Sequence, residues 1–205
     1  MDAKYSRKEA THRRIVEVAA RAIRRGGYGG VGVADIMKEA GLTHGGFYAH
    51  FPSRDAMLAE AVEYAGEQVL QVYAERTKEL REQGASPFRA LVESYLSERH
   101  LDALENGCPI AALASDMPRQ APEVQAASRE RVHIMFNVVK RVLPDHVDPD
   151  QSAVIASTLV GTLSLARALG TGPESKALLA HSRDALLARY DKPGNSIADD
   201  DGSDI

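Results

Sequence analysis

Two short stretches of this chain carry residue types that could bind a partner or react with one. The first runs from Gly41 to Asp55 and reads GLTHGGFYAHFPSRD. It places two adjacent glycines inside a short helical pattern, although each glycine there costs up to about 1 kcal/mol against alanine. A bare backbone allows close approach of another molecule, and the neighbouring hydroxyl and imidazole groups supply hydrogen bonds. The pattern favours a binding surface rather than a catalytic centre.

The second stretch, NGCPIAALASDM, holds the single cysteine, Cys108, immediately before Pro109. Proline is favoured in the first turn of a helix, so Cys108 is expected at a helix N-terminus, where a thiolate is stabilised. One hypothesis is that Cys108 senses reactive electrophiles. The alternative is a small buried hydrophobe, which is the commoner role of a free cysteine. A single cysteine excludes a disulfide framework and fits a reducing, cytoplasmic location.

Charge is distributed unevenly along the 205 residues, although the net charge is only −4. Residues 1–54 contain ten Lys or Arg against five Asp or Glu, whereas the remainder contains fifteen against twenty-four. This asymmetry indicates that only the N-terminal part meets a polyanion, unless the modest excess arose by chance. The longest apolar run, near residues 153–166, is too short to cross a bilayer, so no membrane partner is expected.

Helix signals recur along the chain, and strand-like alternation is absent from the sequence. Ser6-x-x-Glu9 is a capping box that predicts a first helix, which Gly26-Gly27 ends. Short helices are expected over residues 33–40 and 43–50, with a tight turn at Gly41 between them. Ser53 is the expected N-cap of a long helix reaching about residue 83.

Prolines place the remaining helix starts, because the missing N–H costs nothing in the first turn. The expected starts are at Pro87, Pro109, Pro122, Pro149 and Pro173, and the last helix ends near Tyr190. The prediction is an all-α chain of about nine helices. Residues 1–53 form an N-terminal three-helix domain, residues 54–190 a helical bundle, and residues 191–205 a disordered acidic tail.

Two helices joined by a glycine-containing turn and preceded by a third predict a helix-turn-helix, whose second helix enters the DNA major groove. Helical geometry puts Phe47 and Phe51 on the inner side of that helix and Gly45 and Ala49 on the outer side. We therefore expect double-stranded DNA as the partner. The candidate DNA-binding residues are Thr43, His44, Gly45, Gly46, Tyr48, His50, Arg54, Lys4, Arg7 and Lys8.

The stretch from Arg13 to Leu58 closely resembles the N-terminal domain of TetR/AcrR-family transcriptional regulators. The motifs that carry the resemblance are Gly27-Tyr28, Asp35-Ile36, Ala40-Gly41, Phe47-Tyr48-x-His50-Phe51 and Ser53-Arg54-Asp55. The resemblance implies a cytoplasmic homodimer that binds a palindromic operator. It also implies that residues 54–190 are an effector-binding and dimerisation domain, and that the protein is a repressor released when a small molecule binds this domain.

Gly32 and Ala34 depart from the family pattern, which commonly has Thr or Ser followed by a basic residue at the start of the second helix. The resemblance implies that the helices over residues 150–170 and 173–190 pair with their copies across a two-fold axis as a four-helix bundle. The alternative for the first of them is an ordinary core helix within one chain. The effector is unknown, and the effector or redox-sensing candidates are Cys108, Tyr95, His100, Met117 and Asn137.

Other classes of protein are less well supported by the sequence. Catalytic motifs, zinc-like ligand spacing and cofactor signatures are absent, so we expect no enzyme activity, no metal and no cofactor. The main alternative is a helical protein-interaction module without specific DNA binding.

Overall fold

The computed structural model describes residues 6–191, and all its regular secondary structure over that range is helical. The elements are α1 (Arg7–Gly26), α2 (Val33–Glu39), η1 (His44–Ala49), α3 (Arg54–Glu82), α4 (Pro87–Tyr95), α5 (Glu98–Asp102), α6 (Pro109–Leu113), η2 (Met117–Arg119), α7 (Pro122–Val142), α8 (Gln151–Ala168) and α9 (Pro173–Tyr190). The predicted all-α class is confirmed.

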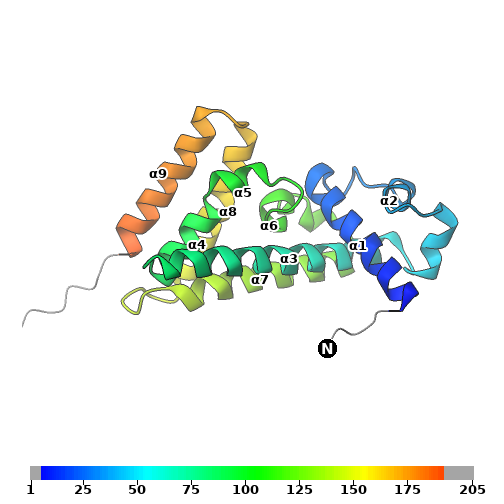
Figure 1. Cartoon of the computed structure of the whole chain (residues 1–205), viewed down its shortest axis with the longest axis horizontal. Helices are drawn as coiled ribbons and strands as arrows, with labels where there is room; N and C mark the ends of the chain where they lie inside the picture. Colours follow the sequence, from blue (N-terminus) through cyan, green and yellow to red (C-terminus); the bar gives the residue numbers. More distant parts are fainter. Residues whose placement is uncertain (1–5, 192–205) are drawn as a thin grey trace, which may run out of the picture.

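The long helix α3 connects the two ends of the molecule (Figure 1). At one end α1, α2 and η1 form a small unit, which we call the head. α7 runs beside α3, while α8 and α9 pack against each other at the end away from the head. α3 contacts both α1 and α7, and α1 also contacts α6, so the head is held on the C-terminal helices through both α3 and α1.

Helix ends in the head follow the local sequence signals. Ser6 and Glu9 form the predicted capping box of α1. At the end of α2, the N–H of Leu42 donates to the carbonyl of Met37 at 2.8 Å, and Gly41 donates to Lys38 at 3.0 Å. Gly41 has a φ of 67°, which glycine adopts without strain. This turn ends α2 and sets the direction in which the chain continues into η1.

Several elements differ from those expected. The third element of the head is a 3₁₀ helix, η1, rather than an α-helix. The helix opened by Pro87 ends at Tyr95, and a separate five-residue helix, α5, follows it. α6 ends at Leu113, and the short 3₁₀ helix η2 follows it. α8 begins at Gln151, two residues after Pro149.

The predicted acidic tail falls outside the described residues from residue 192 onward. Asp191 itself caps α9 and accepts hydrogen bonds from the Ser86 hydroxyl and from Arg89 Nε, the latter at 2.9 Å. Within residues 6–191, no helix combines the length and apolar character needed to traverse a bilayer.

Candidate functional site

Two phenylalanines hold η1 against the head from behind. Phe47 and Phe51 are each 1% exposed, and their ring centroids lie 5.5 Å apart in a stacked arrangement. The imidazole of His12, from α1, stacks on Phe51 at 4.4 Å and pairs with Glu60 of α3 at 2.6 Å. The two rings face inward, as their spacing predicted, and through His12 they connect the back of η1 to α1 and α3.

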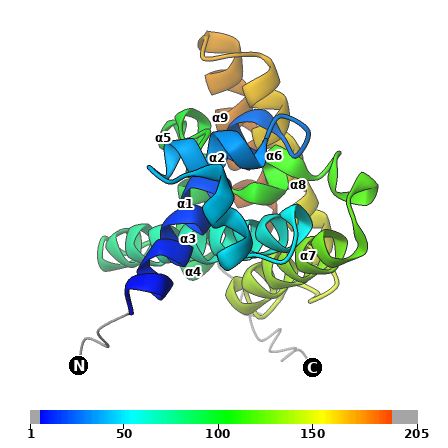
Figure 2. The same ribbon diagram turned by 90° about the vertical axis from the view of Figure 1, so that its right-hand side faces the viewer.

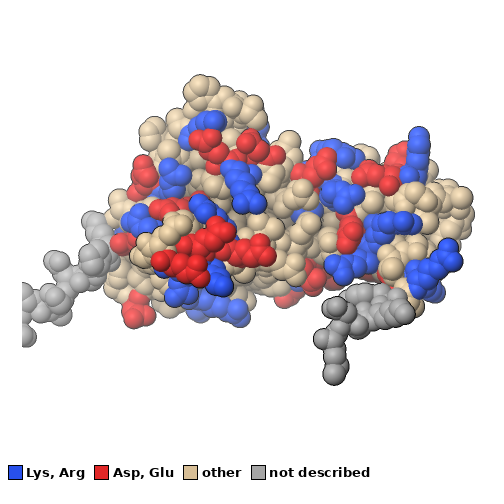
Figure 3. Space-filling model, in the orientation of Figure 1, with Lys and Arg blue, Asp and Glu red and all other residues tan. Residues whose placement is uncertain are grey.

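The opposite side of η1 is open to solvent. Thr43, His44, Gly45 and Ala49 are exposed, and the Tyr48 ring is 72% exposed. A Cβ built on Gly45 would meet no atom within 4 Å. The tip of the head that η1 occupies is largely uncharged, with basic side chains on either side of it (Figure 3). A flat backbone surface with an aromatic hydroxyl beside it results.

Exposed cations flank this surface. Arg7, Lys8 and Arg14 on α1 are exposed and have no ion-pair partner among the described residues. Lys4 lies outside the described residues. Seen end-on in Figure 2, α1, α2 and the start of α3 face the viewer together. The exposed cations of α1 therefore border the η1 surface. The arrangement can attract a polyanion without any acidic residue on η1 itself.

Two of the predicted DNA-binding residues, Arg54 and His50, form contacts within the protein or are partly buried in it. Arg54 donates from Nε to the Val31 carbonyl at 3.1 Å and from a terminal nitrogen to the Tyr28 carbonyl. It therefore fixes the loop that precedes α2, and its contact with phosphate stays a prediction. Burial, with His12 and Lys8 nearby, lowers the pKa of His50. Its Nδ1 is buried without a hydrogen-bond partner in the described part of the chain.

Residues 15–61 match the model of a family described as bacterial regulatory proteins, tetR family. This N-terminal domain is that of the TetR family. The match covers the apolar stripe of α1, all of α2 and η1, and the start of α3, so the resemblance seen in the sequence is confirmed. A comparison with curated proteins gave no match.

Over the rest of the chain, solved structures show the fold. The crystal structure of a TetR transcriptional regulator from Chloroflexus aurantiacus is 22% identical, with 89% of this chain and 96% of that one covered at a TM-score of 0.68. A TetR transcriptional regulator from Legionella pneumophila is 20% identical, with 93% and 100% covered at 0.71. The reduced form of Escherichia coli NemR is 15% identical, with 85% and 96% covered at 0.67. The chain has the fold of TetR-family transcriptional regulators.

Three of the sequence-predicted effector residues meet in one buried cluster of this TetR-like fold. Nε2 of His100 accepts a hydrogen bond from the backbone N–H of Cys108 at 3.0 Å, and Nδ1 donates to the Tyr95 carbonyl at 2.8 Å. The hydroxyl of Tyr73, which sequence reasoning missed, contacts the same ring. Burial raises the pKa of both tyrosines. The imidazole and the two tyrosine hydroxyls are therefore neutral at pH 7, which suits positioning or hydrogen bonding rather than acid–base catalysis.

The other predicted effector residues are not part of this cluster. Met117 is 7% exposed in the core at the start of η2. Asn137 is exposed on α7, and among the described residues no hydrogen bond joins it to His100 or Cys108. Cys108 is the N-cap of α6, as predicted, but it is only 3% exposed.

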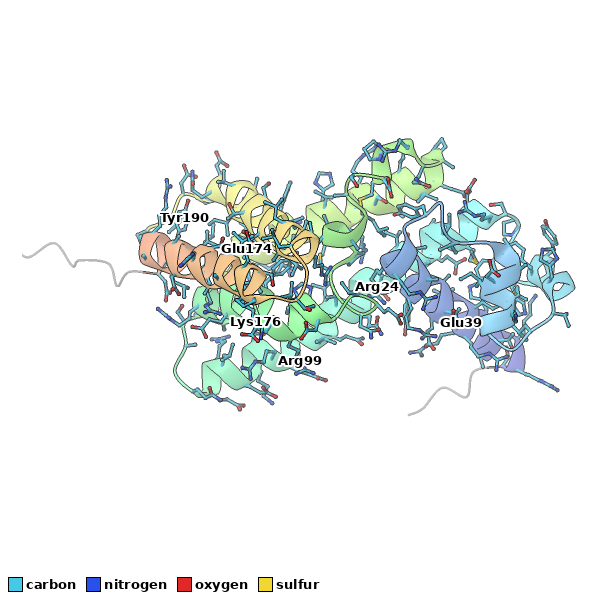
Figure 4. The ribbon with its side chains drawn as sticks, turned by 90° about the horizontal axis from the view of Figure 1, so that it is seen from above. Arg24, Glu39, Arg99, Glu174, Lys176 and Tyr190 are labelled. Carbon is cyan, nitrogen blue, oxygen red and sulfur yellow. The ribbon has the colours of Figure 1, made fainter. Side chains whose placement is uncertain are left out.

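A buried arginine, which sequence reasoning missed, connects the head to this cluster. Arg24 of α1 is 5% exposed and donates to the Gly107 carbonyl at 3.2 Å and to Gln68 Oε1 of α3 at 2.7 Å. Figure 4 shows Arg24 where α1 meets the connection before α6, which comprises residues 103–108. A signal existed in the sequence, because Val16, Ala20 and Arg24 are four residues apart and line one buried edge of α1.

The buried imidazole makes stability depend on pH. Burial lowers the pKa of His100 from its ordinary 6.5 to about 4. Between these values the unfolded chain binds a proton that the folded chain does not, so stability is full above about pH 6.5 and falls as the pH drops toward 4, by up to about 3 kcal/mol. Urea unfolding at pH 7 and pH 5 measures this loss. His100→Gln should reduce it, whereas His133→Gln, on the exposed face of α7, should retain it.

Proposed function

We propose that this chain is a ligand-responsive DNA-binding transcriptional regulator, with residues 1–53 as the DNA-binding domain and residues 54–190 as the effector-binding and dimerisation domain. The observation that carries the proposal is the geometry of η1, whose exposed side holds Gly45 and Tyr48 while Phe47 and Phe51 fix it from behind. Such a surface lets backbone and hydroxyl groups reach phosphates and base edges in a major groove. We propose no catalytic role.

An apolar stripe on α8 supports a homodimer. Val154, Leu165 and Leu169 are 55%, 61% and 46% exposed, and they share one helix face with Gly161. Exposed apolar side chains gathered in this way favour a contact with a second copy, and glycine permits close helix approach. A two-fold dimer would present two heads to a palindromic operator.

The proposed direction of control is repression, relieved when a small molecule binds the C-terminal helices. Modification of Cys108 is the alternative trigger, but burial of the thiol argues for the non-covalent one. The cavity beside Cys108 is about 30 Å³, lined also by Gly66 and Arg131, and offers room for little more than a water molecule. Operator release by a quinone that persists in Cys108→Ser would exclude the covalent trigger.

Tyr48→Ala tests the DNA-binding surface. The ring makes only an edge contact with Phe47, at 5.2 Å, so its loss should leave the fold unchanged. We expect DNA affinity to fall about 10-fold across sequences, because a phosphate donor is lost rather than a base contact. Electrophoretic shift with DNA from upstream of the chain's own gene measures the effect. Tyr48→Phe, the matched control, separates the hydroxyl from the ring.

Salt supplies the independent check on this proposal. Affinity should fall steeply as salt is raised, since phosphate neutralisation by Arg7, Lys8 and Arg14 releases counterions. Binding that is insensitive to salt, or no binding to any fragment in a genomic selection, would support the interaction module instead.

A further inference from the structure

A cavity of about 490 Å³ lies between α3, the α4–α5 junction and the connection before α6 (residues 103–108). This volume is typical of a small-molecule site. Val69 and Val72 of α3 form an apolar wall, and the Val72 side chain is 43% exposed although it is apolar. Tyr73 and His100, from the buried cluster, close one side. The cavity thus has apolar area that no protein side chain covers.

An unused hydrogen-bonding group lines the same cavity. Ser94 is 3% exposed, and its hydroxyl is buried with no hydrogen-bond partner in the described part of the chain. A buried hydroxyl that forms no hydrogen bond is costly, so its retention is explained by a partner that comes from outside the chain.

The charge of the cavity is one-sided. Arg76 and Arg99 line it, and no acidic residue does. Arg99 is exposed and has no ion-pair partner among residues 6–191, while Arg76 pairs only with Glu79, at 2.9 Å on the surface. Figure 4 shows Arg99 on the side of the molecule where Lys176 of α9 also lies. Two guanidinium groups with weak or no internal pairing suit a carboxylate, which they can bind in a bidentate way.

A larger cavity, of about 800 Å³, lies near the end of α7 and has mixed charge, because Arg89, Arg141 and His146 line it together with two aspartates. Its Arg89 is already paired with Asp191 at 2.9 Å and with Glu93 at 3.3 Å, and Asp145 and Asp191 line it. The 490 Å³ cavity is therefore the better anion site.

We propose that the cavity lined by Ser94, Arg76 and Arg99 is the effector site, and that its ligand is a small organic acid with an apolar body and one carboxylate. The carboxylate binds Arg99 and Arg76 at the mouth, the apolar body covers Val69 and Val72, and an oxygen of the ligand satisfies the Ser94 hydroxyl. This assignment rests on the proposed ligand-responsive function.

Contacts behind the cavity explain how the head would respond. Asn106 and Gly107 form part of its wall, and Gly107 accepts the hydrogen bond from Arg24 of α1. The same connection is tied to α1 by an ion pair between Arg25 and Glu105 at 2.9 Å. A ligand that displaces this wall changes contacts made by the head.

Titration calorimetry on the full chain, without DNA, tests the site directly. The probes are benzoate and octanoate, with benzamide and octanamide as neutral counterparts of nearly the same shape. We expect at least one acid to bind and its amide to bind at least about 10-fold more weakly. Arg99→Gln should weaken acid binding about 10-fold. Arg129→Gln, the same charge change on exposed α7, should leave it unchanged.

Three outcomes would overturn the site: no acid binding up to about 10 mM, equal binding of acid and amide, or equal losses in the two arginine variants. A parallel DNA shift separates this from the broader proposal. If the chain binds DNA but no acid, only the site assignment fails. If acid binds at the site but no DNA is bound, the regulator proposal fails, and what stands is a carboxylate-binding site rather than an effector site.

Discussion

Gly45→Glu is expected to lower DNA affinity by at least about 100-fold while leaving the fold intact, because a carboxylate placed against phosphates costs several kcal/mol. A Cβ at Gly45 meets nothing within 4 Å, and the residue does not have a positive φ, so the side chain is accommodated in the free protein. Electrophoretic shift measures the affinity, and thermal unfolding checks that the protein is folded.

Two further variants serve as controls for Gly45→Glu. Gly172→Glu makes the same charge change at the N-cap of α9, where a Cβ also meets nothing, and should leave DNA binding unchanged. Gly45→Ala adds only a methyl group and should stabilise the chain by up to about 1 kcal/mol. If Gly45→Glu binds DNA as tightly as the wild type does, η1 does not face DNA and the assignment of this surface is wrong.

The largest effect on stability is expected for Arg24→Ala, at about 3 kcal/mol of unfolding free energy. The change removes a buried guanidinium and leaves the Gly107 carbonyl and Gln68 without their donor. Burial lowers the pKa of Arg24 to about 10, so the group is charged at neutral pH and its loss is the loss of a cation with directed hydrogen bonds. Urea unfolding at pH 7 measures the difference.

Arg21→Ala is the matched control for that experiment. Arg21 is on the same helix, but its side chain is 35% exposed and contacts Glu39 at 3.5 Å. A surface pair of this kind contributes roughly 0–1 kcal/mol. Equal losses in the two variants would show that Arg24 acts only through general helix stability and not through its contacts with α3 and the connection before α6.

Local signals in the sequence predicted most of the fold. Ser6 and Ser53 cap the helices at which they were placed, and Pro87, Pro122 and Pro173 open α4, α7 and α9 as expected. These signals act over three or four residues, so the chain itself displays them. The separation of α5 from α4 was missed although Ser97 is the N-cap of α5, because no glycine or proline marks the end of α4 at Leu96.

The site was predictable where it depends on helical spacing and not where it depends on distant partners. The inward side of η1 followed from the four-residue spacing of Phe47 and Phe51. The partners of Arg24 are 44 and 83 residues away in sequence, and no periodic pattern indicates them. The partners of Arg54 were equally unpredictable, because the carbonyls to which it donates belong to a loop whose path the sequence does not reveal.

Arginines from two different helices, α1 and α8, donate hydrogen bonds to the connection before α6 and the residues beside it. Arg167 of α8 donates to the carbonyls of His100 and Ala103 at 2.8 and 3.2 Å, opposite the contact made by Arg24. The head is also carried on α3, whose 29 residues span roughly 43 Å. On a lever of that length, a tilt of about 5° at the far end moves the tip by about 4 Å. In the proposed two-fold dimer, two heads would read successive turns of a duplex whose repeat is roughly 34 Å, so a slight rotation at this junction would put the heads out of register with that repeat.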